Sequence, residues 1–156
     1  MRAVIVASVL ALAACGEAVD PPPLGDYTAW DRFVYSGPAP GHGDTYRVVY
    51  VNPMARCGAP SCVPGDPVPP VYITYPVGSV LVKEVYDEEG GALRELAMMR
   101  RLTDTAPPAL TEEGGWLFSD TDSVGGDEVH EDYCWGHCHV AAPYNGAFYN
   151  YRVPLP

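Results

Sequence analysis

The sequence has little positive charge and almost no lysine. Its 156 residues include nine lysines and arginines against 20 acidic residues, and Lys83 is the only lysine. Because this excess of negative charge repels nucleic acid and anionic membrane surfaces, neither is expected as a partner. The sequence also lacks a phosphate-binding glycine loop, a Ser/His/Asp nucleophile signature and internal repeats. The length suits one domain with one modest core.

Long apolar runs are missing too, apart from one at the start. Arg2 is followed by an apolar stretch over residues 3–14 that is too short to span a membrane. This is typical of a secretory signal peptide, and Leu12–Cys15 resembles the bacterial lipoprotein box, in which Cys15 becomes the lipidated first residue. An ordinary signal with a nearby cysteine is the alternative. We therefore expect export to the periplasmic face of a bacterial membrane or the cell surface, with a signal peptide over 1–14, an anchor and proline-rich tether over 15–25 and one domain over 26–156.

Only five cysteines are present, and four of them follow this leader. Cys57 and Cys62 bracket a short loop with little apolar material, and we expect them to form a disulfide. Cys134 and Cys138 lie just before His139, which is the layout of c-type haem attachment, where two thiols bond the haem and the imidazole binds the iron. The usual spacing is C-x-x-C-H, whereas three residues separate the cysteines here. A Cys134–Cys138 disulfide and a zinc site are therefore the alternatives.

Strand patterns dominate the remaining chain. β-branched and aromatic residues predict strands over 45–51, 71–75, 79–86 and 116–118. Residues 92–102 fit a helix by their spacing, but a strand returning from the Gly90-Gly91 turn fits the hairpin context, and we choose the strand. Trp30, Phe33 and Val34 have helical spacing, which predicts a short helix over 27–34 with Asp26 as its N-cap. Glycine and proline predict loops over 36–44, 54–70, 103–114 and 119–132. With one or two helical turns at the cysteines and a strand or extended tail over 148–153, the pattern predicts a mainly β or α+β domain with an antiparallel sheet.

Four stretches carry a family resemblance when taken together. They are residues 46–53, 78–85 and 115–118, and the cysteine segment with Phe148 downstream. In this order and at this spacing, over residues 27–153, they resemble the cytochrome P-460 family of bacterial periplasmic haem proteins. The resemblance implies a mainly antiparallel β domain with a few helices, often as a homodimer. It also implies one haem c bonded to Cys134 and Cys138, with His139 as the proximal iron ligand, an open distal face and an electron-transfer partner.

The resemblance also points to Lys83. In family members that oxidise hydroxylamine, a strand lysine is bonded to the porphyrin edge; members without that bond, similar to cytochrome c′-β, bind nitric oxide. Strand alternation puts Lys83 on one face with Leu81 and Val85, where a lone ammonium is costly. A bond to haem removes that cost. So does a salt bridge, for example to Glu84, or a position at a sheet edge from which the ammonium reaches solvent.

Acidic and histidine side chains near the cysteines are further candidates. Glu128 and Glu131 lie in an acidic loop before the cysteine segment, where a carboxylate over the distal face can take protons from bound hydroxylamine. A solvated acidic loop is the alternative. His42, His130 and His137 are expected at the surface. We expect a haem c protein that binds or oxidises hydroxylamine or nitric oxide; the alternative is a haem-free, disulfide-stabilised surface lipoprotein with a binding or structural role.

Overall fold

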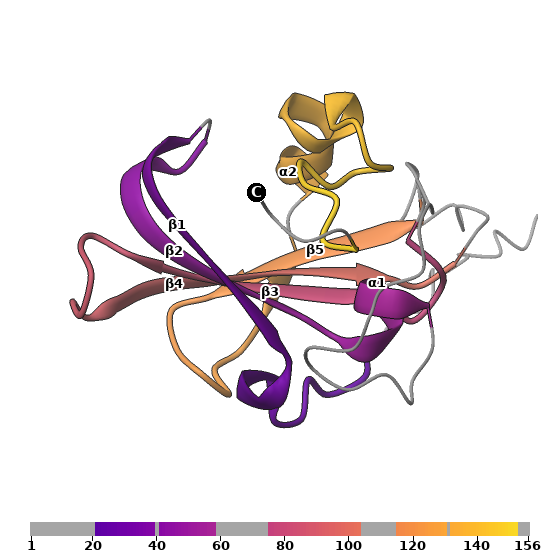
Figure 1. Cartoon of the computed structure of the whole chain (residues 1–156), viewed down its shortest axis with the longest axis horizontal. Helices are drawn as coiled ribbons and strands as arrows, with labels where there is room; N and C mark the ends of the chain where they lie inside the picture. Colours follow the sequence, from indigo (N-terminus) through magenta and orange to yellow (C-terminus); the bar gives the residue numbers. More distant parts are fainter. Residues whose placement is uncertain (1–20, 40, 59–74, 104–114, 131, 153–156) are drawn as a thin grey trace, which may run out of the picture.

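The described part of the chain is built around one open antiparallel sheet (Figure 1). The computed structural model describes residues 21–39, 41–58, 75–103, 115–130 and 132–152. Six strands pair in the order in which they follow one another along the chain, and every pair is antiparallel. The predicted mainly β class, with an antiparallel sheet and few short helices, is therefore confirmed. No helix within these ranges is long and apolar enough to cross a membrane.

Most of the strongly patterned segments form the predicted elements. The strands are β1 (Asp31–Ala39), β2 (Gly43–Val51), β3 (Val80–Tyr86), β4 (Leu93–Arg101), β5 (Trp116–Thr121) and β6 (Val129–His130). The helices are α1 (Pro53–Cys57) and α2 (Asp132–His137), and the 3-10 turns are η1 (Tyr27–Ala29) and η2 (His139–Ala141). The predictions of β2, β3, β4, the start of β5 and a helical turn at the cysteines are confirmed.

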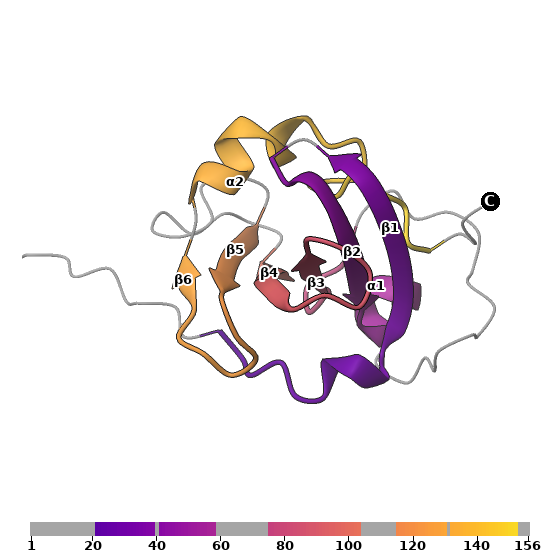
Figure 2. The same cartoon turned by 90° about the vertical axis from the view of Figure 1, so that its left-hand side faces the viewer.

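The two faces of the sheet are covered by different parts of the chain. Side chains alternate along β3, so Leu81 belongs to one apolar cluster and Val82 to the other. The cluster around Leu81 is closed by the C-terminal segment, including Tyr151, and the cluster around Val82 is closed by Tyr27 of η1. In both views α2 lies on one side of the sheet and the segment before β1 on the other (Figure 2). Lys83 shares its face with Leu81 and so points toward the C-terminal segment.

The first hairpin differs from the prediction. Residues 31–39 form a strand that pairs along its whole length with β2, where a helix over 27–34 and a loop over 36–44 were expected. Exposure alternates along β1, which puts Phe33 and Tyr35 against the cluster closed by the C-terminal segment. This packing and nine cross-strand partners outweigh the local helical spacing. The predicted helix is therefore limited to the 3-10 turn over Tyr27–Ala29, and the predicted loop is wrong over the residues of β1 and β2.

The polar residues before η1 and α1 differ in whether they cap the helix that follows. Asp26 makes no cap to η1, and its carboxylate instead accepts a hydrogen bond from Thr28 Oγ1 at 2.6 Å. Asn52 does cap a helix, because its side-chain oxygen accepts the backbone N–H of Ala55 at 2.8 Å, and α1 therefore forms where a loop was predicted.

Two more predicted segments differ from the structure, and two others lie outside the described residues. Residues 148–152 make bends and turns rather than the strand or extended tail expected there. The loop over 119–132 is shortened, because β5 continues to Thr121 and β6 pairs with it. Residues 71–74 and 104–114 lie outside the described residues.

Candidate functional site

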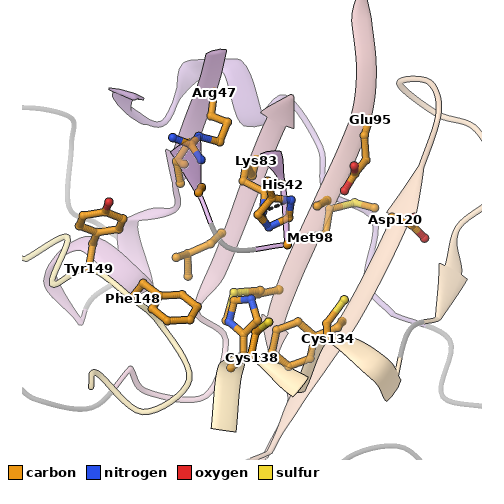
Figure 3. Close-up of a pocket in the computed structure, with 18 of the residues that line it drawn as sticks. His42, Arg47, Lys83, Glu95, Met98, Asp120, Cys134, Cys138, Phe148 and Tyr149 are labelled. Atoms are coloured by element: carbon orange, nitrogen blue, oxygen red, sulfur yellow. Dashed lines mark hydrogen bonds between the residues drawn. The ribbon is translucent and has the colours of Figure 1, made fainter. Parts of the chain in front are cut away.

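A cavity of about 360 Å³ lies between the sheet and the C-terminal segment (Figure 3). Its floor is the face of the sheet that carries Lys83, and its walls come from the tip of the β1–β2 hairpin, from α2 and from the chain after α2. This volume lies within the range of small-molecule sites, roughly 300–1,000 Å³. Polar side chains gather on the strand side of the cavity, and the cysteines lie on the opposite side.

Strand pairing fixes the polar groups of the floor. Lys83 is the cross-strand partner of Val49 on one side and of Ala97 on the other, and Ala97 is paired with Asp120. Neighbouring strands are about 4.8 Å apart, so Lys83 and Asp120 stand roughly 10 Å apart with only the small Ala97 side chain between them. The buried Oδ1 atom of Asp120 has no hydrogen-bond partner among the residues that the structure describes. The floor therefore has a gap over Ala97, with Lys83 on the strand to one side of it and Asp120 on the strand to the other.

The cysteine segment forms the facing wall. α2 carries Cys134, and its last turn brings the backbone N–H of Cys138 within 3.3 Å of the Cys134 carbonyl oxygen. Both cysteines are present as thiols and both line the cavity. The hairpin tip closes over them, since a β-carbon built on Gly41 would lie 3.9 Å from Cys138 Sγ. The structure therefore does not join the two cysteines in the disulfide that was one alternative.

His139 follows directly and is held in one tautomer. Its Nδ1 atom lies 2.6 Å from the carbonyl oxygen of Gly146, so Nδ1 carries the proton and donates it, and the lone pair is on Nε2. The ring packs against Phe118 at 4.8 Å and Phe148 at 5.1 Å between centroids. Burial lowers the pKa of His139, and the nearby Lys83 lowers it further, against the opposing effect of the Gly146 hydrogen bond. A neutral imidazole with a fixed Nδ1–H is the form that binds metals through Nε2.

The side chains of this cavity include the types that a covalently bound haem would use. Among the described residues, no three His, Cys, Asp or Glu side chains stand close enough together to hold a metal ion. Haem needs less from the protein: two thiols beside its edge, one axial imidazole and apolar walls. Cys134, Cys138 and His139 are of the first three kinds, and Leu81 and Phe118 give the floor apolar surface.

Comparisons of the chain with family models, curated proteins and solved structures give no match. The choice of ligand therefore rests on the donor groups and their geometry. The cavity holds a further candidate for chemistry besides the cysteine segment, namely a buried amine on its floor.

The buried amine is that of Lys83. Its Nζ atom lies 2.5 Å from Nε2 of His42, which stands at the hairpin tip. Burial lowers the pKa of Lys83 to about 8, against the opposing effect of Glu95. Burial, and then the charge of Lys83, lower the pKa of His42 to about 4. His42 is therefore neutral at pH 7 and accepts the hydrogen bond from Lys83.

Neither of the two simpler explanations for Lys83 holds. The suggested salt bridge to Glu84 is wrong, because Glu84 lies on the other face, where it accepts hydrogen bonds from Tyr27 at 2.9 Å and Tyr86 at 2.8 Å. The sheet-edge explanation is also wrong, because β3 is an inner strand and the Lys83 side chain lines the cavity.

His42 is the site residue that the sequence prediction missed. It was expected at the surface, but it lines the cavity and bonds Lys83. Gly41 and Gly43 on either side of it have φ angles of +75° and +69°, which glycine adopts easily. These angles allow the tight turn that places His42 over the sheet. A histidine between two glycines at a hairpin tip was the available signal. The exposed positions of His130 and His137 confirm the prediction for those two residues.

The acidic candidates are not brought into the cavity. Glu128 does not line it; its carboxylate contacts Arg100 Nη1 at 2.7 Å and Nη2 at 2.6 Å, and Arg100 packs with Met98 on the opposite face. This placement contradicts the role of Glu128 as a base over a distal face. The side chain of Glu131 lies outside the described residues.

The remaining cysteines are only partly described. Cys57 is disulfide-bonded and ends α1. Its predicted partner Cys62 and the predicted lipidation site Cys15 both lie outside the described residues. The Cys57–Cys62 pairing and the lipid anchor therefore stay predictions.

Proposed function

We propose that the protein is a c-type haem protein of the cytochrome P-460 kind, with its haem in the cavity between the sheet and α2. The observation that carries the proposal is the His139 tautomer. Its proton is held on Nδ1 by Gly146, and its Nε2 lone pair belongs to a ring that lines the same cavity as Cys134 and Cys138. A buried histidine with this second hydrogen bond is preorganised for a metal.

Each side chain of the cavity has a distinct role in this proposal. Cys134 and Cys138 would hold the haem through thioether bonds to its two vinyl groups, and His139 would supply its imidazole to the iron. Leu81, Phe118 and neighbouring apolar groups exclude water. Haem, when bound, would supply an iron that takes hydroxylamine or nitric oxide and exchanges electrons. A partner protein receives the electrons from an oxidised substrate.

Lys83 decides between oxidation and simple binding. Its amine shares the cavity with the cysteines, so it is available for a bond to the porphyrin edge. Such a bond would replace one N–H and one C–H by C–N, and its two protons and two electrons would have to pass to a two-electron oxidant. Hydrogen peroxide would serve as that oxidant, because it takes up the two protons and the two electrons when it is reduced to two molecules of water. A bonded Lys83 nitrogen carries no full charge, which removes the cost of burying the ammonium.

The proposed location follows from the leader. We propose that Cys15 is lipidated and tethers the domain to the periplasmic face of the membrane or to the cell surface. Disulfide bonds persist in these oxidising compartments. A homodimer is part of the same proposal through the family resemblance. Globomycin, which blocks lipoprotein signal cleavage, should then cause the full-length precursor to accumulate; normal processing under the drug would remove the anchor from the proposal.

The haem itself is tested by expressing the full chain with the c-type maturation machinery and recording the pyridine haemochrome spectrum. The expected spectrum is that of thioether-bonded haem. It should be lost in the Cys134→Ala, Cys138→Ala double variant, and axial ligation should change in His139→Ala. His137→Ala is the matched control, because His137 lies two residues away and is exposed. A wild-type protein without haem would support the haem-free binding lipoprotein instead.

A further inference from the structure

The chain's single lysine is enclosed in a cavity that has room for a small molecule beside it. We propose that this cavity captures small neutral aldehydes covalently, with Lys83 Nζ forming an imine and His42 holding the amine in position. This activity goes beyond haem binding and does not rest on it. It uses only the floor and the hairpin tip of the cavity.

The contact between Lys83 and His42 prepares the amine for attack on a carbonyl group. His42 Nε2 accepts a hydrogen bond from Nζ, which fixes the position of the nitrogen within the cavity (Figure 3). An amine is nucleophilic only without its extra proton, and burial holds the pKa of Lys83 at about 8. At pH 7 this gives roughly 300 times more neutral amine than a lysine with the usual pKa of 10.5.

The surroundings of Lys83 select the kind of carbonyl compound. The gap over Ala97 lies next to Lys83 on the floor, and Leu81 and Phe118 offer apolar surface for a hydrocarbon chain. The charged side chains that line the cavity together with the amine are Arg47, Glu95 and Asp120, and of these Glu95 and Arg47 act on the charge of Lys83. With Lys83 neutral, the two carboxylates outnumber the single guanidinium. A neutral aldehyde therefore enters more easily than an anionic keto acid.

Imine formation here needs no oxidant or reductant. The Nζ lone pair forms the new bond to the carbonyl carbon. The two hydrogens of the neutral amine leave with the carbonyl oxygen as one molecule of water, and a C=N double bond remains. The two cysteine thiols can add to an aldehyde as well, but those adducts are reversible and are not fixed by mild hydride reduction. Reductive trapping therefore reports the amine alone.

One nitrogen cannot hold both an aldehyde and a porphyrin. The capture is therefore tested on the full chain made without the c-type maturation machinery and, in parallel, on the holoprotein. Failure of capture in the haem-free chain would overturn this proposal and leave the haem proposal untouched. Protection of the holoprotein is expected with or without a bond to Lys83, because bound haem would occupy the same cavity; modification of Lys83 in the holoprotein would show that its nitrogen is not bonded to haem.

The experiment incubates the haem-free full chain with butanal and sodium cyanoborohydride at pH 7 and follows the butyl adduct by intact mass and peptide mapping. The matched control is the double variant Lys83→Arg, Arg94→Lys, which moves the single lysine to an exposed site on β4. We expect the peptide with Lys83 to be modified at least tenfold faster than the peptide with the lysine at position 94. A smaller ratio, or an adduct only at the N-terminal amine, would overturn the proposal.

Two further measurements test whether the fast modification of Lys83 depends on the fold and on His42. Unfolding the wild-type chain in urea should abolish the rate advantage of Lys83, and an unchanged rate would show that the fold contributes nothing; this comparison needs no variant to fold. His42→Ala should slow modification at least threefold, whereas His42→Gln, which keeps a hydrogen-bond acceptor, should restore most of the rate. Equal rates in wild type and His42→Ala would remove His42 from the proposal.

Discussion

Arg100 and Glu128 meet through two parallel contacts on the face of the sheet opposite the cavity, with Nη1 2.7 Å from Oε2 and Nη2 2.6 Å from Oε1. The Arg100 side chain is only 1% exposed, and Ser119 also donates a hydrogen bond to Glu128 at 2.7 Å. This contact ties the loop before β6 to the inner strand β4. It assigns Glu128 a structural role in place of the catalytic one expected from its position in the sequence.

Glu128→Gln should destabilise the fold. The substitution leaves the buried guanidinium of Arg100 without its counter-charge, and we expect a loss of roughly 2–4 kcal/mol in the free energy of unfolding. Urea denaturation of both proteins measures it. Asp87→Asn is the control, because Asp87 pairs with Arg94 at the surface, with 80% of its side chain exposed, and such pairs contribute less than about 1 kcal/mol. Similar losses in the two variants would contradict the proposed role of burial.

The contribution of Arg100 and Glu128 to the free energy of unfolding should depend on pH. Burial alone raises the pKa of Glu128, but the hydrogen bonds from Arg100 and Ser119 outweigh it and hold the pKa below 4.5. Stability from a carboxyl with a depressed pKa is fully present above the unfolded-state value and is lost as the pH falls through the folded-state value. The stability difference between wild type and Glu128→Gln should therefore be constant above about pH 5 and shrink below pH 4.5.

The parts of the fold that the sequence predicted are those whose signals are local. Alternation in β3 correctly put Lys83 and Leu81 on one face, and the β-branched run of β2 marked a strand. β1 was missed because Phe33 also fits a helical pattern, and only the pairing with β2 decides between the two structures. The position of His42 was missed for the same reason, since it depends on how a hairpin folds back over a distant strand.

Replacing Gly146 is expected to destabilise the fold more than replacing a glycine with open space around it. Gly146 has a φ angle of +90°, and a β-carbon there would lie 2.9 Å from Trp116 Nε1 and 2.9 Å from a ring carbon of Trp135. Gly146→Ala should cost about 2–4 kcal/mol, from backbone strain together with the clash. Gly125→Ala is the control, because Gly125 has a similar φ of +77° but open space around it, and it should cost only about 1 kcal/mol.

The Gly146 variant should also loosen His139, because the Gly146 carbonyl holds its Nδ1 proton. Nuclear magnetic resonance of the imidazole nitrogens measures the tautomer directly. We expect a single Nδ1–H tautomer in the wild type and in Gly125→Ala, and a mixture of both tautomers in Gly146→Ala. A single unchanged tautomer in all three proteins would show that this hydrogen bond does not set the form of His139.

Replacing the buried amine should stabilise the haem-free protein. Lys83→Met keeps the length of the side chain and removes a group whose pKa burial has lowered from 10.5 to about 8, which corresponds to a gain of up to about 3 kcal/mol at pH 7. Between about pH 8 and pH 10.5, Lys83 carries its extra proton in the unfolded state but not in the folded state. The wild type therefore becomes more stable relative to the variant as the pH rises from about 8 to 10.5. Thermal unfolding at pH 7, 8, 9 and 10.5 measures the difference; a gap independent of pH would contradict the lowered pKa.

The haem proposal is tested most sharply at Lys83, because that residue separates an oxidising enzyme from a protein that only binds nitric oxide. Lys83→Arg keeps a positive charge in the cavity, and its guanidinium does not form the nitrogen bond to the porphyrin edge. In the wild-type holoprotein we expect a haem peptide in which the Lys83 segment is linked to the segment with Cys134 and Cys138. Lys83→Arg should still bind haem and nitric oxide, lose the linked peptide and lose hydroxylamine oxidation by at least tenfold. If the wild-type haem peptide contains the cysteine segment alone, Lys83 stays an amine, and the binding role replaces the oxidising one.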